Sequence, residues 1–247
     1  MENLLLGNCL DLLPDIPNKS IDAIIADLPY GITQAKWDCE IDLDELWKQY
    51  KRIKKPDAPI VLFASQPFTS KLISSNLKEF KYCWYWEKEK GTGFLNTKYQ
   101  PLRCIEEVCI FYRKAGKYNP QMVPLDKPYR HKLPTNKTET VKDTVPSFSN
   151  EEIQYRLYTH SHPKNLLRFS RDNRNQGVHS TQKPISLMKY LVATHSNKND
   201  LILDNTMGSG TTGMACKELN RQFIGMEIDP NTFKIAQERI KNASVPK

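Results

Sequence analysis

The chain has 247 residues, which is enough for one large domain with a substantial core and excludes a miniature fold held together by disulfides. Hydrophobic residues make up 39% and charged residues 26% of the sequence, so the protein is neither disordered nor fibrous. The formal net charge of +8 favours a polyanionic partner.

Composition also bears on compartment and metal content. No apolar run approaches the roughly 18 residues that a membrane-spanning helix needs, and residues 1–13 lack the features of a secretory signal. The cysteines form no C-x-x-C pair and no cluster with histidines, so we interpret them as buried reduced thiols and expect no metal site. We expect a cytoplasmic protein without membrane association. The cysteines are Cys9, Cys39, Cys83, Cys104, Cys109 and Cys216.

The first hundred residues alternate short apolar runs with amphipathic stretches, which is typical of an α/β sheet. Between Asp42 and Ile53 the apolar residues recur at the spacing of one helix face. A Gly-containing loop, residues 91–103, separates the last two predicted strands. The predicted strands are Asn3–Leu6, Ala23–Ala26, Ile60–Ala64, Tyr82–Trp86 and Val108–Tyr112.

Residues 115–180 lose this periodicity, and their six prolines predict an irregular insertion rather than a second compact domain. This segment carries +5 of the net charge of +8, and its aromatic residues are interleaved with basic ones. Such a mixture can stack on bases and neutralise phosphates. We favour this interpretation over a loop that its rings merely pin to the core.

Regular structure returns at Lys183, where Pro184 is suited to the first turn of a helix. The remaining pattern predicts a β-α-β-α order. Its elements are a strand at Leu201–Leu203, a helix through Cys216 and Leu219, a strand at Phe223–Met226 and a helix that begins at Asp229-Pro230.

Closely spaced glycines, Gly208 and Gly210, follow the predicted strand that ends near Asp204. They let the backbone turn sharply and let a ligand approach, which is typical of a cofactor loop. Glu227 ends the next strand, where its carboxylate can accept hydrogen bonds from both ribose hydroxyls of a nucleoside. With Gly213 the glycines also match G-x-G-x-x-G, so dinucleotide binding and a ligand-free turn are alternatives, although only 43 residues follow Asp204.

A second group, Asp27-Leu28-Pro29-Tyr30, stands at the carboxyl end of a predicted buried strand, where reacting groups gather in α/β sheets. Exocyclic amines of nucleobases are poor nucleophiles because the nitrogen lone pair is delocalised into the ring. A carboxylate and a main-chain carbonyl that each accept one amine hydrogen leave that lone pair aimed at an electrophile. The tyrosine ring offers a surface on which an extruded base can stack.

Taken together, these motifs resemble the amino-group DNA methyltransferases that use S-adenosylmethionine, in the permuted arrangement (beta class) where the catalytic motif comes first and the cofactor loop last. Asp27-Leu28-Pro29-Tyr30 looks like the family's Asp-Pro-Pro-Tyr signature, and residues 204–212 look like its Asp-Pro-Phe-x-Gly-Ser-Gly-Thr-Thr loop. Further matches are Gly7-Asn8-Cys9, His179–Pro184 and Gly225-Met226-Glu227.

The resemblance implies a Rossmann-like methyltransferase sheet, circularly permuted. Residues 1–114 would form the catalytic part, residues 115–180 the target-recognition insertion and residues 181–247 the cofactor-binding part. It implies DNA as substrate and a role in restriction-modification in a prokaryotic or phage-infected cell, and it leaves a homodimer open. The Asp form of the signature favours N6 of a flipped adenine.

The resemblance also assigns roles to residues. The catalytic residues are Asp27, Leu28, Pro29 and Tyr30. The residues expected at S-adenosylmethionine are Asn8, Cys9, Asp27, Lys183, Asp204, Met207, Gly208, Ser209, Gly210, Thr211, Thr212, Glu227 and Ile228. Residues expected at DNA are Lys36, Trp37, Arg130, Lys132, Arg168, Arg171 and Arg174.

Three departures from the family pattern keep alternatives open: Leu28 replaces a proline, Asn8 replaces an aspartate, and Asn205-Thr206 replace Pro-Phe. The first is tolerable because a carbonyl acts there, and Asn8 keeps an acceptor but loses charge. The alternatives are a cytosine-N4 or RNA methyltransferase of the same fold, and a nucleic-acid-binding homologue with an inactive cofactor pocket.

Overall fold

The computed structural model describes residues 2–31, 40–132, 155–170 and 182–244 of the chain. It divides into two compact units. The larger unit comprises Met1–Asn119 and Lys164–Lys247, and the smaller one comprises Pro120–Pro163. The predicted insertion therefore contributes to both units, because residues 115–119 and those from Lys164 onward belong to the larger one.

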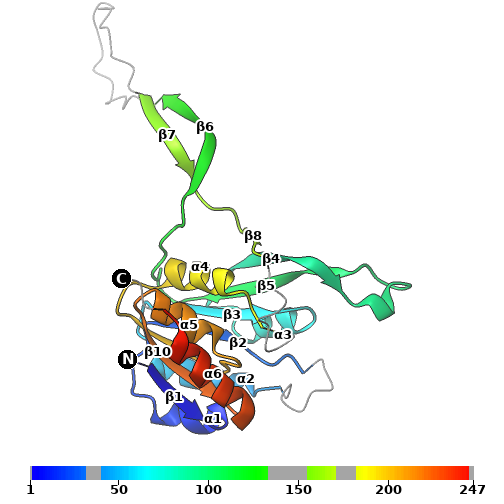
Figure 1. Cartoon of the computed structure of the whole chain (residues 1–247), viewed down its shortest axis with the longest axis vertical. Coiled ribbons are helices and arrows are strands. Elements are labelled where there is room, and N and C mark those ends of the chain that lie inside the picture. The colour runs from blue at the N-terminus through cyan, green and yellow to red at the C-terminus, as the bar shows by residue number, and fades with distance from the viewer. Residues whose placement is uncertain (1, 32–39, 133–154, 171–181, 245–247) are drawn as a thin grey trace, which may run out of the picture. The chain divides into compact units, whose positions relative to one another are not determined.

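An eight-stranded sheet forms the larger unit, in the order β1-β10-β9-β2-β3-β5-β4-β8 (Figure 1). The five strands from β1 to β3 are parallel, β5 is antiparallel to both β3 and β4, and β8 is parallel to β4. The strands are β1 (Glu2–Leu6), β2 (Ala23–Asp27), β3 (Ile60–Ala64), β4 (Phe80–Thr92), β5 (Arg103–Phe111), β8 (Leu166–Arg168), β9 (Leu201–Asp204) and β10 (Gln222–Glu227).

Helices cover both faces of this sheet, because the buried strands are apolar on both sides. Alternate residues of β2 show the division: Ile24 packs into the core that includes α1 to α3, and Ile25 into the core that includes α4 to α6. The helices are α1 (Cys9–Leu12), α2 (Leu43–Ile53), α3 (Phe68–Ser75), α4 (Ile185–His195), α5 (Thr211–Glu218) and α6 (Pro230–Asn242). Short 3-10 turns occupy Leu13–Asp15 and Phe94–Asn96.

The α/β prediction is confirmed, and so is the β-α-β-α order after Lys183. The long helix α2 begins where expected because the Asp42 side chain accepts hydrogen bonds from the backbone N–H groups of Asp44 and Glu45. Two short helices, α1 and α3, were not predicted. β4 continues to Thr92 and pairs there with Arg103, so the loop expected at residues 91–103 is shorter.

The smaller unit contains an antiparallel strand pair, β6 (Val123–Lys132) and β7 (Tyr155–Ser161). The expectation that residues 115–180 are wholly irregular is therefore wrong for this part of the segment, and for β8. Tyr129 and Tyr158 stack across the pair with ring centroids 5.4 Å apart, which stabilises a pair whose strand β6 contains two prolines. No helix in the described part of the chain is long and apolar enough to span a membrane.

Candidate active site

The two predicted motifs meet at the carboxyl edge of the sheet. β2 and β9 are adjacent parallel strands, with Ile24 opposite Leu203, so Asp27 and the glycine turn leave the sheet side by side. The Thr206 hydroxyl donates a hydrogen bond to the Asp27 carbonyl over 3.0 Å. These two segments, about 180 positions apart in the chain, therefore lie at neighbouring strand ends of one sheet.

A cavity of about 730 Å³ opens at this edge, within the volume range of ligand sites in proteins. It is lined by all four residues predicted to be catalytic and by most of those predicted at the cofactor. Gly210 does not line it. A side-chain atom at Gly210 would lie 3.0 Å from Ala236 and Ile240, so this glycine lets the loop pack closely against α6.

Asp27 lies at the centre of a charged cluster. Its Oδ1 accepts a hydrogen bond from the Tyr30 hydroxyl over 2.8 Å, and its Oδ2 lies 2.6 Å from Lys183 Nζ. The same Nζ lies 2.8 Å from Glu106 Oε1, so one lysine bridges two carboxylates. Lys88 adds a weaker contact to Glu106, over 3.5 Å. The cluster thus contains two carboxylates and two ammonium groups.

Burial governs the electrostatics of this cluster. It raises the pKa of Asp27, because desolvation disfavours the carboxylate by more than Lys183 stabilises it. The two carboxylates in turn raise the pKa of Lys183 although burial lowers it, so the lysine stays charged. For Glu106, the contacts to Lys183 and Lys88 outweigh burial and lower the pKa. The positive charge is therefore fixed, and Asp27 is the group whose charge is least stabilised.

The remaining catalytic positions are held by packing. Leu28 is buried, and the Tyr30 ring stacks on Phe68 with centroids 5.2 Å apart and planes 27° from parallel. Gly31 follows with a φ of 66°, a left-handed conformation that favours glycine.

The glycine turn after β9 is built around buried Asp204. This carboxylate accepts hydrogen bonds from the Thr212 hydroxyl over 2.6 Å and from the Thr206 backbone over 3.1 Å. Burial raises the pKa of Asp204 to about 7. Gly208 has a φ of 52° and open space beside its Cα, so its backbone faces the cavity. Ser209 is tied to Arg239 of α6 over 2.7 Å.

The opposite wall of the cavity comes from the ends of β1 and β10. Glu227 is partly buried, and its Oε1 accepts the Asp229 N–H over 2.8 Å. Ile228 is 56% exposed at the rim. Asn8 caps α1 by accepting the Leu10 N–H, which places it and the buried thiol of Cys9 beside the cavity. Burial raises the pKa of Cys9, so this thiol is protonated.

These residues fit a nucleoside-containing cofactor. Gly208 leaves space for close approach to its backbone, Glu227 supplies a carboxylate, and Ile228 supplies an apolar surface for a ring. The Asn205 Nδ2 donor is buried at the cavity without a hydrogen-bond partner among the described residues. A buried donor of this kind is costly unless a ligand or water pairs with it.

Lys183 lines the cavity, and its ammonium group is engaged by Asp27 and Glu106. Its role at the cofactor stays a prediction. Glu106, Lys88 and Thr206 were missed. The signal for Glu106 was present in the sequence, because a charged pair, Glu106-Glu107, interrupts the apolar strand β5. Thr206 could not be found this way, because its partner is a main-chain carbonyl of another strand.

The residues predicted at DNA fall into three groups. Arg130 and Lys132 lie on β6 of the smaller unit. Arg168 lies on β8 of the larger unit and forms an ion pair with Glu87 over 2.7 Å. The others lie outside the described residues: Lys36, Trp37, Arg171 and Arg174. Among the cysteines, Cys104 is exposed rather than buried as predicted, and Cys39 lies outside the described residues.

The fold and the paired motifs define a methyltransferase-like site, and comparison with known families gives the class. Residues 21–238 match the family model of N6/N4 methyltransferases, described as DNA methylase. The match covers most of the chain, so this protein belongs to that DNA methylase family.

Individual relatives agree with this assignment. The chain is 25% identical to the Type II methyltransferase M.HpaI of Haemophilus parainfluenzae, over 97% of this chain and 74% of the relative. It is 27% identical to the Type II methyltransferase M.HindIII of Haemophilus influenzae, over 91% of this chain and 90% of that protein.

Solved structures extend the likeness to three dimensions. The M1.HpyAVI–SAM complex matches with a TM-score of 0.64 and 26% identity, covering 97% of this chain and 100% of that one. The cytosine-N4-specific PvuII DNA methyltransferase matches with a TM-score of 0.70 at 16% identity, covering 99% of this chain and 88% of that one. The second likeness establishes the fold alone.

Proposed function

We propose that this protein transfers a methyl group from S-adenosylmethionine to the exocyclic N6 of an adenine flipped out of DNA. The proposal depends mainly on one observation. Asp27, at the tip of β2, and Gly208, in the turn after β9, line one cavity at neighbouring strand ends. Such an arrangement places an amine acceptor and a cofactor loop within one site. Membership of the DNA methylase family supports the proposal, and the Asp form of the catalytic tetrapeptide favours adenine over cytosine.

The cofactor would be held by the Gly208 backbone, by Glu227 at its ribose and by Asn8 with Ile228 near its adenine. When bound, S-adenosylmethionine supplies an electrophilic methyl group on a sulfonium. The buried Asn205 Nδ2 has no partner among the described residues and offers the cofactor one more donor. The carboxylate of Glu227 is already oriented by the Asp229 N–H, so little ordering is needed on binding.

Asp27 keeps the capacity to accept a hydrogen from the amine. A carboxylate has about four lone-pair sites, and the Tyr30 hydroxyl and the Lys183 ammonium occupy one on each oxygen. A further site therefore remains for an amine hydrogen, while the Leu28 carbonyl would accept the second. With both hydrogens held, the nitrogen lone pair points at the methyl group, and alignment supplies much of the rate.

The charged cluster keeps Asp27 ready for this role. Asp27 must be ionised to accept, and burial opposes ionisation, so the fixed charge of Lys183 is needed beside it. Transfer of the methyl group from the sulfonium sulfur to the amine nitrogen would leave that nitrogen with one proton too many. Asp27, with its raised pKa, is placed to take that proton and release it to water.

We further propose that the permuted order of the family holds here and that residues 115–180 read the target. The basic residues Arg130, Lys132 and Arg168, together with Arg171 and Arg174, would meet phosphates or bases in this segment. Lys36 and Trp37, which follow the catalytic motif, would lie near the flipped base. An exposed aromatic ring in the smaller unit, Tyr129 at 51% exposure, supports this.

The test is transfer of a tritiated methyl group to DNA, followed by nucleoside analysis of the product. We expect N6-methyladenine, and Asp27→Ala should lower the rate by about a hundredfold because one positioned acceptor is lost. Asp57→Ala, an exposed acid at the other edge of the sheet, is the matched control and should leave the rate unchanged.

Each failure has a separate meaning. N4-methylcytosine as product would refute adenine specificity while leaving the mechanism intact. A rate within about twofold of wild type in Asp27→Ala would refute the role of Asp27. No heat in a calorimetric titration with S-adenosylmethionine would refute catalysis and favour an inactive nucleic-acid-binding homologue.

A further inference from the structure

The hairpin of β4 and β5 projects beyond the catalytic edge of the sheet. β3 ends at Ala64, which pairs with Glu107, whereas β5 begins four residues earlier at Arg103 and β4 continues to Thr92 (Figure 1). The segment from Lys88 to Arg103 is called here the projecting hairpin. Its base belongs to the active site, because Lys88, Thr92 and Arg103 line the cavity.

The tip of the projecting hairpin exposes large apolar side chains. Phe94 is 67% exposed, Leu95 97% and Tyr99 88%. Exposed apolar residues clustered at one place indicate an interaction surface, whereas single ones need no explanation. On β4 and β5 themselves, Trp84, Trp86 and Phe111 are buried, Phe80 and Tyr82 are partly buried, and Tyr85 is 39% exposed.

Hydrogen bonds and close packing give the tip of the projecting hairpin a defined backbone conformation. The turn Phe94–Asn96 is 3-10 helical, and the Asn96 N–H donates to the Gly93 carbonyl over 3.0 Å. The Tyr99 N–H donates to the Asn96 carbonyl over 2.9 Å. At Gly91 a side chain would lie 2.7 Å from Leu102 Cβ, so the two arms pack closely. The apolar side chains are therefore presented on a preorganised support, which lowers the cost of binding.

The charge around the tip identifies the partner. Lys90, Lys98 and Arg103 are exposed, and Glu89 is the one acidic residue of the projecting hairpin. Phe94 follows Thr92 of the cavity by two residues, so their Cα atoms lie within about 8 Å, a span of about two base-pair steps. A duplex positioned over the cavity to deliver a base would therefore meet this tip.

We infer that the projecting hairpin is a DNA wedge, which inserts Phe94 and its apolar neighbours into the base stack beside the flipped base while its basic residues contact phosphates. Apolar wedges between base steps unstack a duplex, and flipping costs least when the base is already unpaired. The inference rests on the proposed function and adds to it the element that opens the duplex.

The test uses the full chain with Phe94→Ala, Leu95→Ala and Tyr99→Ala combined. The methylated sequence is first read by modified-base sequencing of DNA treated with the wild-type enzyme. Two oligonucleotide duplexes with that site are then compared, one fully paired and one with the target base mismatched. Leu77→Ala is the matched control, because Leu77 is 68% exposed near the start of β4, at the other edge of the sheet.

We expect the triple variant to lose at least about tenfold in kcat/KM on the paired duplex, because stacking against a base is removed. On the mismatched duplex it should come within about threefold of wild type, since the unpaired base needs no wedge. Calorimetric affinity for S-adenosylmethionine should be unchanged, which shows that the variant is folded. Leu77→Ala should match wild type in every assay.

Three results would overturn the wedge. One is activity of the triple variant within twofold of wild type on the paired duplex. Another is equal loss on both duplexes. The third is a change of sedimentation from dimer to monomer with the loss of activity, which would make the tip a contact between copies of this chain. If the wild-type enzyme methylates no DNA, the proposed function fails instead.

Discussion

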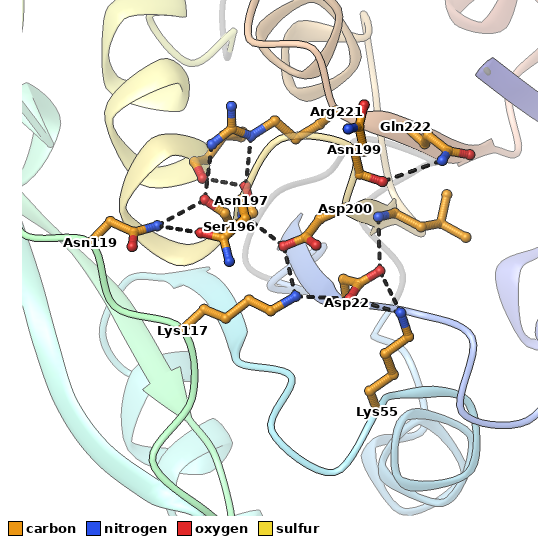
Figure 2. Close-up of polar contacts among 12 residues, drawn as sticks. Asp22, Lys55, Lys117, Asn119, Ser196, Asn197, Asn199, Asp200, Arg221 and Gln222 are labelled. Carbon is orange, nitrogen blue, oxygen red and sulfur yellow. Dashed lines mark hydrogen bonds and ion pairs between the residues drawn. The ribbon is translucent and has the colours of Figure 1, made fainter.

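The same arrangement of charged side chains occurs at both ends of strand β2, but its consequences at the two ends are opposite. At its carboxyl end Lys183 bridges Asp27 and Glu106. At its amino end Lys117 bridges Asp22 and Asp200, with both distances 2.8 Å (Figure 2). Each end therefore has one lysine between two carboxylates, contributed by three separate segments of the chain.

The difference lies in how completely each carboxylate is paired. Asp22 also accepts a hydrogen bond from Lys55 over 2.9 Å (Figure 2). It accepts another from the Leu201 N–H over 3.1 Å. Burial raises its pKa, but these donors outweigh burial, and the pKa of Asp22 is lowered. Burial prevails at Asp27, where the pKa is raised. At the amino end of β2 the carboxylate is well paired with donors, and such a cluster, called here the saturated end, contributes stability. At the carboxyl end, called the unsaturated end, the carboxylate beside the cavity keeps capacity to accept a hydrogen bond from a substrate.

Hydrogen bonds near the saturated end also hold the chain in place just before it enters the smaller unit. Asn119 Nδ2 donates to the Ser196 carbonyl over 3.0 Å and to Asn197 Oδ1 over 3.1 Å (Figure 2). Arg221 donates to the same carbonyl over 2.9 Å. Asn119 is the last residue of the larger unit before Pro120 begins the smaller one. The chain is thus anchored where the predicted target-recognition segment leaves the catalytic body.

The largest effect is expected at the unsaturated end. Lys183→Met leaves Asp27 and Glu106 without their shared cation, and removal of one partner of a buried pair typically costs about 3–5 kcal/mol. Loss of the positive charge raises the pKa of Asp27 further, and Asp27 must be ionised to accept the amine. The acid limb of the kcat/KM profile should therefore move to higher pH, with a loss on the order of a hundredfold at neutral pH.

Two controls separate this role from general damage. Lys183→Arg keeps the charge and should restore most of the activity and the acid limb. Lys48→Met removes an exposed lysine, 74% exposed on α2, and should change neither. An acid limb that stays in place in Lys183→Met, in a variant that still binds S-adenosylmethionine, would refute the role of the lysine.

The saturated end should respond in stability and leave the chemistry intact. Lys117→Met should lower the free energy of unfolding by about 2 kcal/mol, since the side chain is 20% exposed and solvent replaces part of the lost pairing. The lowered pKa of Asp22 contributes stability above its usual titration range, which disappears as pH falls. The difference between variant and wild type should therefore shrink in acid.

Urea unfolding at several pH values measures this difference, with kcat/KM of the folded variant measured alongside. A loss of activity without a loss of stability would contradict the division between the two ends. Lys48→Met again serves as the exposed control, because solvent screens exposed pairs such as Lys48–Glu45 and they add little stability.

The sequence predicted the sheet and the site where physical periodicity or motif spacing carries the information. Ile60–Ala64 is buried on all sides and reads as an apolar run, and β3 has those bounds. Asp27 and Gly208 were found because their chemistry depends on local residue types. α3 was missed because its apolar positions are few and its start, at Pro67, has no capping side chain.

What the sequence could not reveal depends on contacts between distant segments. Lys183 and Glu106 are 77 residues apart, and no pattern near either indicates that one neutralises the other. The pairing of β6 with β7 was missed because Pro124 and Pro128 interrupt the strand pattern. The ring stack between Tyr129 and Tyr158 forms only after the chain has returned.

The smallest expected effect concerns a hydrogen bond between the unsaturated end of β2 and the turn after the neighbouring strand β9. Thr206 stands where the family pattern has phenylalanine, and its hydroxyl donates to the Asp27 carbonyl over 3.0 Å. Thr206→Val keeps the shape and removes that donor, at a cost of about 1 kcal/mol, or about fivefold in kcat/KM. Thr206→Ser retains the hydroxyl and should stay within about twofold of wild type. Equal activities of the two variants, measured by steady-state methyl transfer at saturating S-adenosylmethionine, would show that the bond does not position Asp27.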